Sequence, residues 1–93
     1  VDSVHDRVYT ANFTNNSFTA FDATNMTVVG TFPTAGSAYA IAYDEGNDRI
    51  LVVNNSTNNL TVFDAATLTE VSGSPFPVGT SPRDVVVEPV SLP

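Results

Sequence analysis

The sequence predicts an all-β protein made of two similar antiparallel units. Residues 6–29 match residues 48–71 at an offset of 42 positions, with ten identities among the 24 aligned pairs. Within each repeat the apolar stretches are short and rich in Val, Ile, Phe and Tyr. Asn, Asp, Gly and Pro separate these stretches, which is the pattern of strands and turns. We therefore expect two copies of one β-structured unit and no helix.

The second repeat contains four candidate strands. They cover residues 39–43, 49–53, 60–63 and 70–78. The first two are apolar almost without interruption, so both of their faces should be buried, as happens when each blade of a β-propeller lies between two neighbours. Gly73 and Pro75 interrupt the fourth strand, which places it at the outer edge of the sheet.

The predicted fold is thus two four-stranded antiparallel β-propeller blades. Residues 1–38 form a first blade that lacks most of its inner strand, residues 39–82 form the second blade, and residues 83–93 supply an extra inner strand, at residues 84–87, and a tail. The residues expected in buried strands are Val8, Phe21, Ile41, Ile50, Val52, Phe63, Val85 and Val87.

The turns have the composition of tight hairpins. In residues 44–48 we expect Gly46 and Asn47 at positive φ, and the pair Asn58 and Asn59 suits a type I′ turn. The first of these turns is rich in side-chain oxygens, but it lacks the length and the terminal bidentate Glu of an EF-hand, so we interpret it as a hairpin and predict no metal site.

Other polar residues are also interpreted as structural. Asp22 and Asp64 precede the third turn of each repeat, where an Asp side chain accepts backbone N–H groups. His5 is the single histidine and is expected in an exposed turn. With no Cys nucleophile and no second His, we predict no catalytic residue and no cofactor.

The composition narrows the range of partners. Three Lys+Arg against ten Asp+Glu give a formal net charge of −7, which disfavours nucleic acid. No apolar run approaches the roughly 20 residues that span a bilayer, so we expect no membrane insertion. The start at Val1, inside a strand-like pattern, suggests a processed, excised or incomplete chain.

Three segments resemble a known family. Residues 6–12 (DRVYTAN), 21–29 (FDATNMTVV) and 78–87 (VGTSPRDVVV) are similar to the YVTN-type β-propeller repeats of microbial cell-surface and surface-layer proteins, with lactonase-like propellers as relatives. The first repeat departs from this pattern, with Ala38-Tyr39 in place of a Pro-Arg pair. The resemblance implies an extracellular or cell-envelope module that presents loops to protein or glycan partners without catalysis. The alternative is a fragment of a lactonase-like or quinoprotein-like enzyme.

In propellers generally, ligands bind where the loops before the inner strand and after the second strand meet. This rule selects Tyr39, Arg83, Asn12 and Asn54 as candidate ligand-binding residues. An Arg side chain can bind a carboxylate or phosphate through two hydrogen bonds. A salt bridge from Arg83 to Asp84 is the alternative interpretation.

Assembly follows from the blade count. Closed propellers have about 4–8 blades, so two blades cannot close a ring by themselves. We predict a head-to-tail cyclic homo-oligomer of three or four chains, in which the strand at residues 84–87 pairs with the first strand of the next chain. Missing blades in a longer chain are the alternative.

Overall fold

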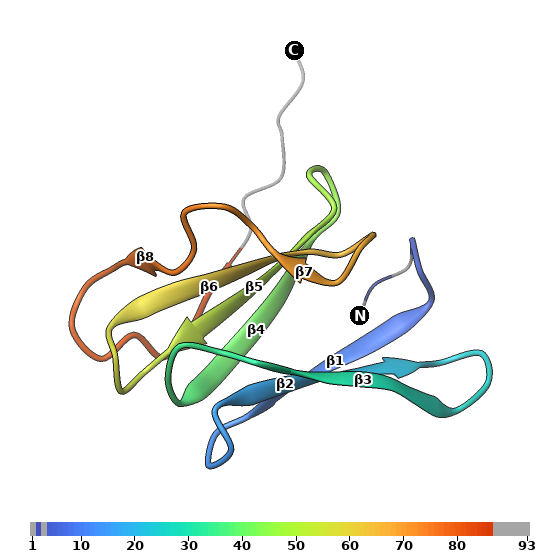
Figure 1. Cartoon of the computed structure of the whole chain (residues 1–93), viewed down its shortest axis with the longest axis horizontal. Helices are drawn as coiled ribbons and strands as arrows, with labels where there is room; N and C mark the ends of the chain where they lie inside the picture. Colours follow the sequence, from blue (N-terminus) through green and yellow to red (C-terminus); the bar gives the residue numbers. More distant parts are fainter. Residues whose placement is uncertain (1, 3, 87–93) are drawn as a thin grey trace.

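The computed structural model describes residues 2 and 4–86 and shows two antiparallel sheets (Figure 1). The first sheet has the strand order β1-β2-β3, and the second has the order β4-β5-β6-β7, with β8 also pairing with β6. The strands are β1 (Arg7–Asn12), β2 (Ser17–Asp22), β3 (Thr27–Pro33), β4 (Ala38–Asp44), β5 (Arg49–Asn54), β6 (Asn59–Asp64), β7 (Thr69–Glu70) and β8 (Phe76–Pro77). The all-β prediction is confirmed. No helix long and apolar enough to cross a membrane occurs in the described residues.

The hairpin turns are four residues long and repeat the same backbone shape in both sheets. Their last residue has positive φ, and the repeat-equivalent pairs are Asp6/Asp48, Asn16/Asn58 and Met26/Leu68. The expectation for Gly46 and Asn47 was therefore wrong. The fourth position of the turn is the one that needs positive φ, and Asp48 occupies it. Asp and Asn tolerate this conformation better than other non-Gly residues.

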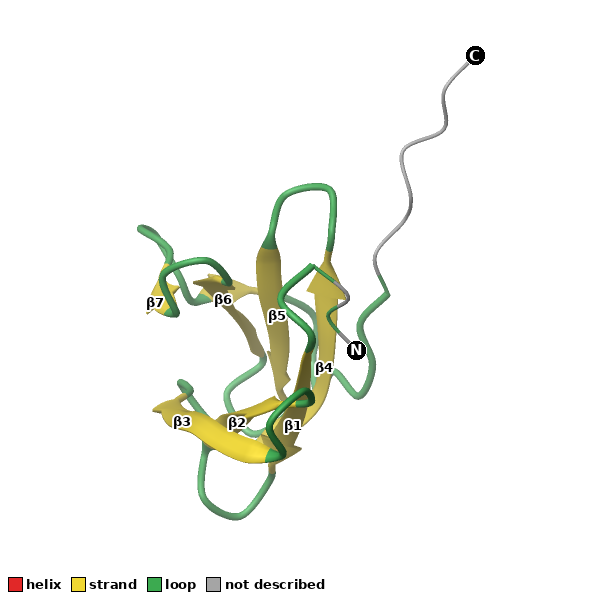
Figure 2. Cartoon of the chain, turned by 90° about the vertical axis from the view of Figure 1, so that its right-hand side faces the viewer, coloured by secondary structure: helices red, strands yellow, loops and turns green. Residues whose placement is uncertain are grey.

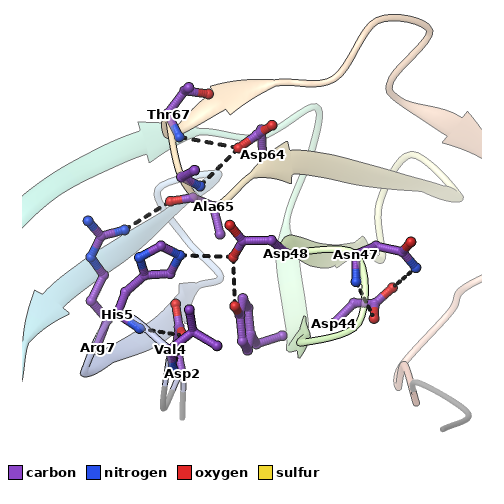
Figure 3. A network of polar contacts seen from close by, with 12 residues as sticks. Asp2, Val4, His5, Arg7, Asp44, Asn47, Asp48, Asp64, Ala65 and Thr67 are labelled. Carbon is purple, nitrogen blue, oxygen red and sulfur yellow. Dashed lines mark hydrogen bonds and ion pairs between the residues drawn. The ribbon is translucent and has the colours of Figure 1, made fainter. Parts of the chain in front are cut away.

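The predicted role of the two turn aspartates is confirmed. Asp22 Oδ1 accepts the backbone N–H groups of Thr24 (2.8 Å) and Asn25 (3.0 Å). Asp64 Oδ1 accepts the backbone N–H groups of Ala66 (2.9 Å) and Thr67 (3.2 Å) in the same way (Figure 3). Each Asp therefore fixes the turn that leads to the outer strand of its sheet.

The outer strand of the second sheet is split, as Gly73 and Pro75 predicted. Only β7 and β8 are left of the expected strand at residues 70–78. The predicted inner strand at residues 84–87 is corrected for residues 84–86, which form no strand, and Val87 lies outside the described residues. A strand requires a hydrogen-bonding neighbour, and the neighbour expected for this segment belongs to another blade.

The two sheets stand at an angle to each other (Figure 2), and an apolar core joins them. Phe18 of the first sheet and Phe63 of the second meet edge to face, with ring centroids 4.8 Å apart and planes at 83°. Phe32 lies beside both rings, at 5.2 Å from Phe18 and 5.9 Å from Phe63. Aromatic rings in this arrangement stabilise the fold by more than their buried apolar area alone would.

The predicted core is confirmed only in the second sheet. Ile50, Val52 and Phe63 are buried, whereas Ile41 and Val85 are half-buried. Val8 and Phe21 are also half-buried, which corrects the prediction for them. They pair with each other on the face of the first sheet that points away from the second. The buried face of the first sheet is instead formed by Tyr9, Ala11, Phe18, Ala20 and Phe32.

Candidate binding face

Four loops meet at one end of the two sheets, at the lower left of Figure 1. We call residues 13–16, 34–37, 55–58 and 78–82 the loop face. Hydrogen bonds join each loop to the next: Thr34 N donates to Asn16 O (2.8 Å), Ser37 N to Ser56 Oγ (3.0 Å), and Ser81 N to Asn58 Oδ1 (2.7 Å). The expectation that these loops share one face is confirmed.

The loop face contains no charged side chain. Its residues are Asn, Ser, Thr, Gly, Ala, Pro, Val and one Phe. Acidic residues gather at the opposite end, in and beside the turns at residues 23–26, 45–48 and 65–68. We call that opposite end the acidic end. The net charge of −7 is therefore distributed unevenly, and the loop face is the neutral end of the molecule.

Two exposed aromatic rings lie together, one in the loop face and one beside it. Phe13, in the turn after β1, and Tyr39, near the start of β4, are 49% and 47% exposed. Their ring centroids are 5.7 Å apart and their planes stand at 80°. Sequence reasoning selected Tyr39 but missed Phe13. A bulky apolar residue in a turn, where the other repeat has Asn55, was the signal that could have found it.

The two predicted asparagines occupy equivalent positions but different environments. Asn12 Nδ2 donates to Ser17 Oγ (3.1 Å) and Thr19 Oγ1 (2.9 Å), and Asn12 is half-buried. Asn54 Nδ2 donates in the same way to Asn59 Oδ1 and Thr61 Oγ1, at 2.8 Å and 2.7 Å. Asn54 is fully buried between the sheets, so its selection as a ligand-binding residue is corrected. It closes the turn at the end of β5.

Arg83 is exposed and follows the segment that closes the loop face. The carbonyl of Pro82 accepts a hydrogen bond from Asn55 Nδ2 at 3.0 Å, which holds this segment against the turn after β5. The alternative salt bridge to Asp84 does not form among the described residues. Asp84 Oδ1 accepts the backbone N–H of Val85 instead, at 2.9 Å. Arg83 therefore lies exposed at the border of the loop face.

A polar network joins the two sheets at the acidic end (Figure 3). His5 Nε2 and the Tyr43 hydroxyl both donate to Asp48 Oδ1, at 2.8 Å and 2.6 Å. Arg7 Nη1 donates to the carbonyl of Ala65 at 3.0 Å. His5 lies in a turn as predicted, but the expected exposure was wrong, because its side chain is only 22% exposed and bonds across the interface between the sheets. Sequence reasoning missed this network because its members lie far apart in the chain.

The network shifts the pKa values of its members. Hydrogen bonds from Tyr43, then from His5, hold the pKa of the Asp48 carboxyl below its usual value. Burial, together with the neighbouring Asp48, raises the pKa of the Tyr43 phenol. Burial and the carboxylate of Asp2, which accepts the Tyr9 hydroxyl at 2.5 Å, likewise raise the pKa of the Tyr9 phenol.

Asp48→Asn is expected to remove part of the acid sensitivity of the fold. A carboxyl with a lowered pKa stabilises the folded state above its unfolded pKa of about 3.9, and loses that contribution as the pH falls through the folded pKa. The free energy of unfolding should therefore drop more steeply below about pH 4 in the natural protein than in the variant. Urea titrations from neutral pH downward measure this difference. Asp84→Asn, at an exposed position, is the control, and equal pH profiles for all three proteins would contradict the assignment.

A hollow lies on the outward face of the first sheet, next to the loop face. It is open to solvent and mostly polar, and its lining combines amide and hydroxyl groups with one proline. The lining residues are Asn12, Asn15, Asn16, Ser17, Thr19, Thr31 and Pro33. Within residues 2 and 4–86, no three His, Cys, Asp or Glu side chains gather as a metal site.

Comparison with known proteins gives a structural relative. No family model and no curated protein matches the sequence. Among solved structures, the chain is similar to hydrazine synthase from Kuenenia stuttgartiensis, a protein that contains a β-propeller, with a TM-score of 0.79 and 22% sequence identity. The match covers 85% of this chain and 22% of that chain, so this chain spans less than a quarter of the relative's length. The likeness shows the fold: the two sheets are β-propeller blades.

Proposed function

We propose that this chain is a noncatalytic β-propeller module of the YVTN type, placed outside the cell or in the cell envelope, which binds a neutral ligand at the loop face. The observation that carries the proposal is the pairing of an uncharged loop face with two exposed aromatic rings on a chain of net charge −7. A glycan fits this chemistry better than a charged ligand does, and an uncharged protein surface is the second ligand class.

The side chains of the loop face suit sugar hydroxyls. Asn side chains offer both donors and acceptors, and Ser and Thr hydroxyls do the same, so each can match a hydroxyl in either role. The exposed rings of Phe13 and Tyr39 supply an apolar surface on which the flat face of a sugar ring can lie. Binding sites commonly combine such apolar surfaces with a few polar groups that fix orientation.

The proposed placement at the cell surface rests on the resemblance of three segments to YVTN repeats. The structural relative supports the fold and not the placement. A module that displays repeated loops on rigid sheets supports binding without chemistry, because the sheets fix the loops. Arg83, at the border of the loop face, adds N–H donors for a hydroxyl or carbonyl oxygen of the neutral ligand.

Binding to an array of neutral glycans tests the proposal. For the glycans that the natural protein binds, we expect Phe13→Ser and Tyr39→Ser each to weaken the affinity at least about tenfold, the equivalent of about 1.4 kcal/mol. Met26→Ser removes a side chain that is 70% exposed at the acidic end, and it should bind normally. Absence of glycan binding, an equal loss in the control, or turnover of a bound glycan or lactone would contradict the proposal.

A further inference from the structure

The interface between the two blades is built from two different surfaces. The first blade contributes Phe18, with Tyr9, Ala20 and Phe32 around it. The second contributes alternate residues of β5 and β6, which pair across the strands as Ile50 with Phe63, Val52 with Thr61, and Asn54 with Asn59. Because the two surfaces differ, the interface joins a front surface to a back surface rather than two identical ones.

The outward face of the first blade repeats the interface surface of the second. Its pairs are Val8 with Phe21, Thr10 with Thr19, and Asn12 with Ser17, each displaced by 42 positions from a pair of the second blade. The Asn12 hydrogen bonds also reproduce those of Asn54. The two surfaces differ in exposure, since Thr10 is exposed whereas its counterpart Val52 is fully buried.

The outward face of the second blade repeats the interface surface of the first. Leu60 pairs with Phe76 there, as Phe18 pairs with Phe32 in the first blade. Phe76 is 39% exposed, although its counterpart Phe32 packs into the core. The two outward faces of the described blades therefore match each other in the way that the two facing surfaces between the blades do.

The loop before β4 shows how the end of one blade meets the next blade. A Cβ atom at Gly36 would lie 2.5 Å from Thr57 Oγ1 and 2.8 Å from Ser56 Oγ, so this loop packs closely on the turn after β5. The backbone N–H of Val78 donates to Asn58 O as that of Thr34 donates to Asn16 O, which makes Gly79 the structural counterpart of Ala35. Residues 78–82 are therefore placed to meet the turn of a further first blade in the same way.

The hollow on the first blade lies where such a contact would form. Between the two blades, the backbone N–H of Ala35 reaches Thr61 Oγ1 at 3.4 Å. The counterpart of Thr61 is Thr19, which lines the hollow. Residues 78–82 follow β8 as residues 34–37 follow β3.

We propose that this chain binds a second copy of itself head to tail, with the outward face of the second blade packed on the outward face of the next copy's first blade. Residues 78–82 of one copy then lie over the hollow of the next. A heterologous contact of this kind closes a ring when the rotation permits, and three or four copies would give six or eight blades, within the range of about 4–8 in closed propellers. This association needs no ligand, and it brings residues 78–82 in the loop face of one copy beside residues 15 and 16 in the loop face of the next.

Two variants that block opposite faces test the proposal. Thr10 and Gly79 are both exposed, so Thr10→Arg and Gly79→Arg should fold normally while each blocks one face. Thr67→Arg makes the same change of charge in an exposed turn at the acidic end and is the control. Circular dichroism and cooperative urea unfolding establish that each variant is folded.

The masses in solution decide the outcome. By light scattering at micromolar concentrations, we expect the natural chain and the control at a multiple of the 9.8 kDa chain mass, and each blocked variant alone as a monomer. An equal mixture of the two blocked variants should form a one-to-one dimer, because one intact front and one intact back remain. A monomeric natural chain, oligomers of either blocked variant, or a mixture that stays monomeric would overturn the proposal.

Discussion

Phe63→Ala is expected to lower the free energy of unfolding by about 3–5 kcal/mol, the usual cost of truncating a buried phenylalanine. Phe63 is 4% exposed and its ring contacts Phe18 and Phe32 of the other blade. The truncation thus removes apolar burial and leaves a cavity in the interface between the blades. Since small domains are stable by only about 5–15 kcal/mol, the variant should unfold at much lower urea concentrations.

Urea unfolding measured by circular dichroism gives this number directly. Phe13→Ala, at an exposed ring in the turn after β1, is the matched control, and its cost should stay below about 1 kcal/mol. A loss below about 1 kcal/mol for Phe63→Ala would remove Phe63 from the core and with it the packing of the two blades.

Asn54→Asp is expected to be the second most damaging substitution, with a loss of about 3 kcal/mol or more at neutral pH. The new side chain has the same shape but cannot donate to Asn59 Oδ1 and Thr61 Oγ1 as Asn54 Nδ2 does. It also places a carboxylate at a fully buried position. Burial raises the pKa of such a group, so the penalty should shrink as the pH falls and the carboxylate takes up a proton.

The repeat supplies an unusually close control for this variant. Asn12→Asp makes the same change among equivalent hydrogen-bond partners, but at a half-buried position. With both substitutions made in the monomeric Gly79→Arg background, where no second copy covers Asn12, its cost should stay at about 1 kcal/mol, because water can solvate the charge. Equal losses in the two variants would show that Asn54 is not enclosed between the blades.

Much of the fold was predictable from local signals. The strand predicted at residues 49–53 is β5, which is one residue longer. The outer strand is interrupted between β7 and β8, where Gly73 and Pro75 predicted a break. Turn aspartates could be recognised because their hydrogen bonds reach only two or three residues ahead. Such features depend only on residues nearby in the sequence, and each of them occurs once in each repeat.

The burial of equivalent residues could not be predicted from the repeat. Phe21 and Phe63 match in sequence and in strand position, yet Phe63 is buried and Phe21 half-buried. The reason is that each blade has a front and a back, and within this chain only one of each is covered. A sequence comparison treats the two residues as equal, whereas their burial depends on which blade stands next to them.

The candidate site was predictable in part for the same reason. Tyr39 and Arg83 lie on or beside the loop face because strand order places them there. Asn54 was wrongly predicted to bind a ligand, because whether a side chain at the end of a strand is buried depends on the packing between blades. The His5 and Asp48 contact joins residues 43 positions apart and follows from that packing alone.

Cross-linking between copies tests most directly the central claim that the interface between the blades is reused between chains. The contact of Phe32 with Phe63 inside the chain corresponds to a contact of Phe76 in one copy with Phe21 in the next. The chain has no cysteine, so Phe76→Cys and Phe21→Cys each introduce a single thiol. With a short thiol-reactive cross-linker, the account predicts a covalent dimer in the mixture of the two variants and little in either alone. Cross-linking that is equally efficient in all three samples, or absent from the mixture, would contradict it.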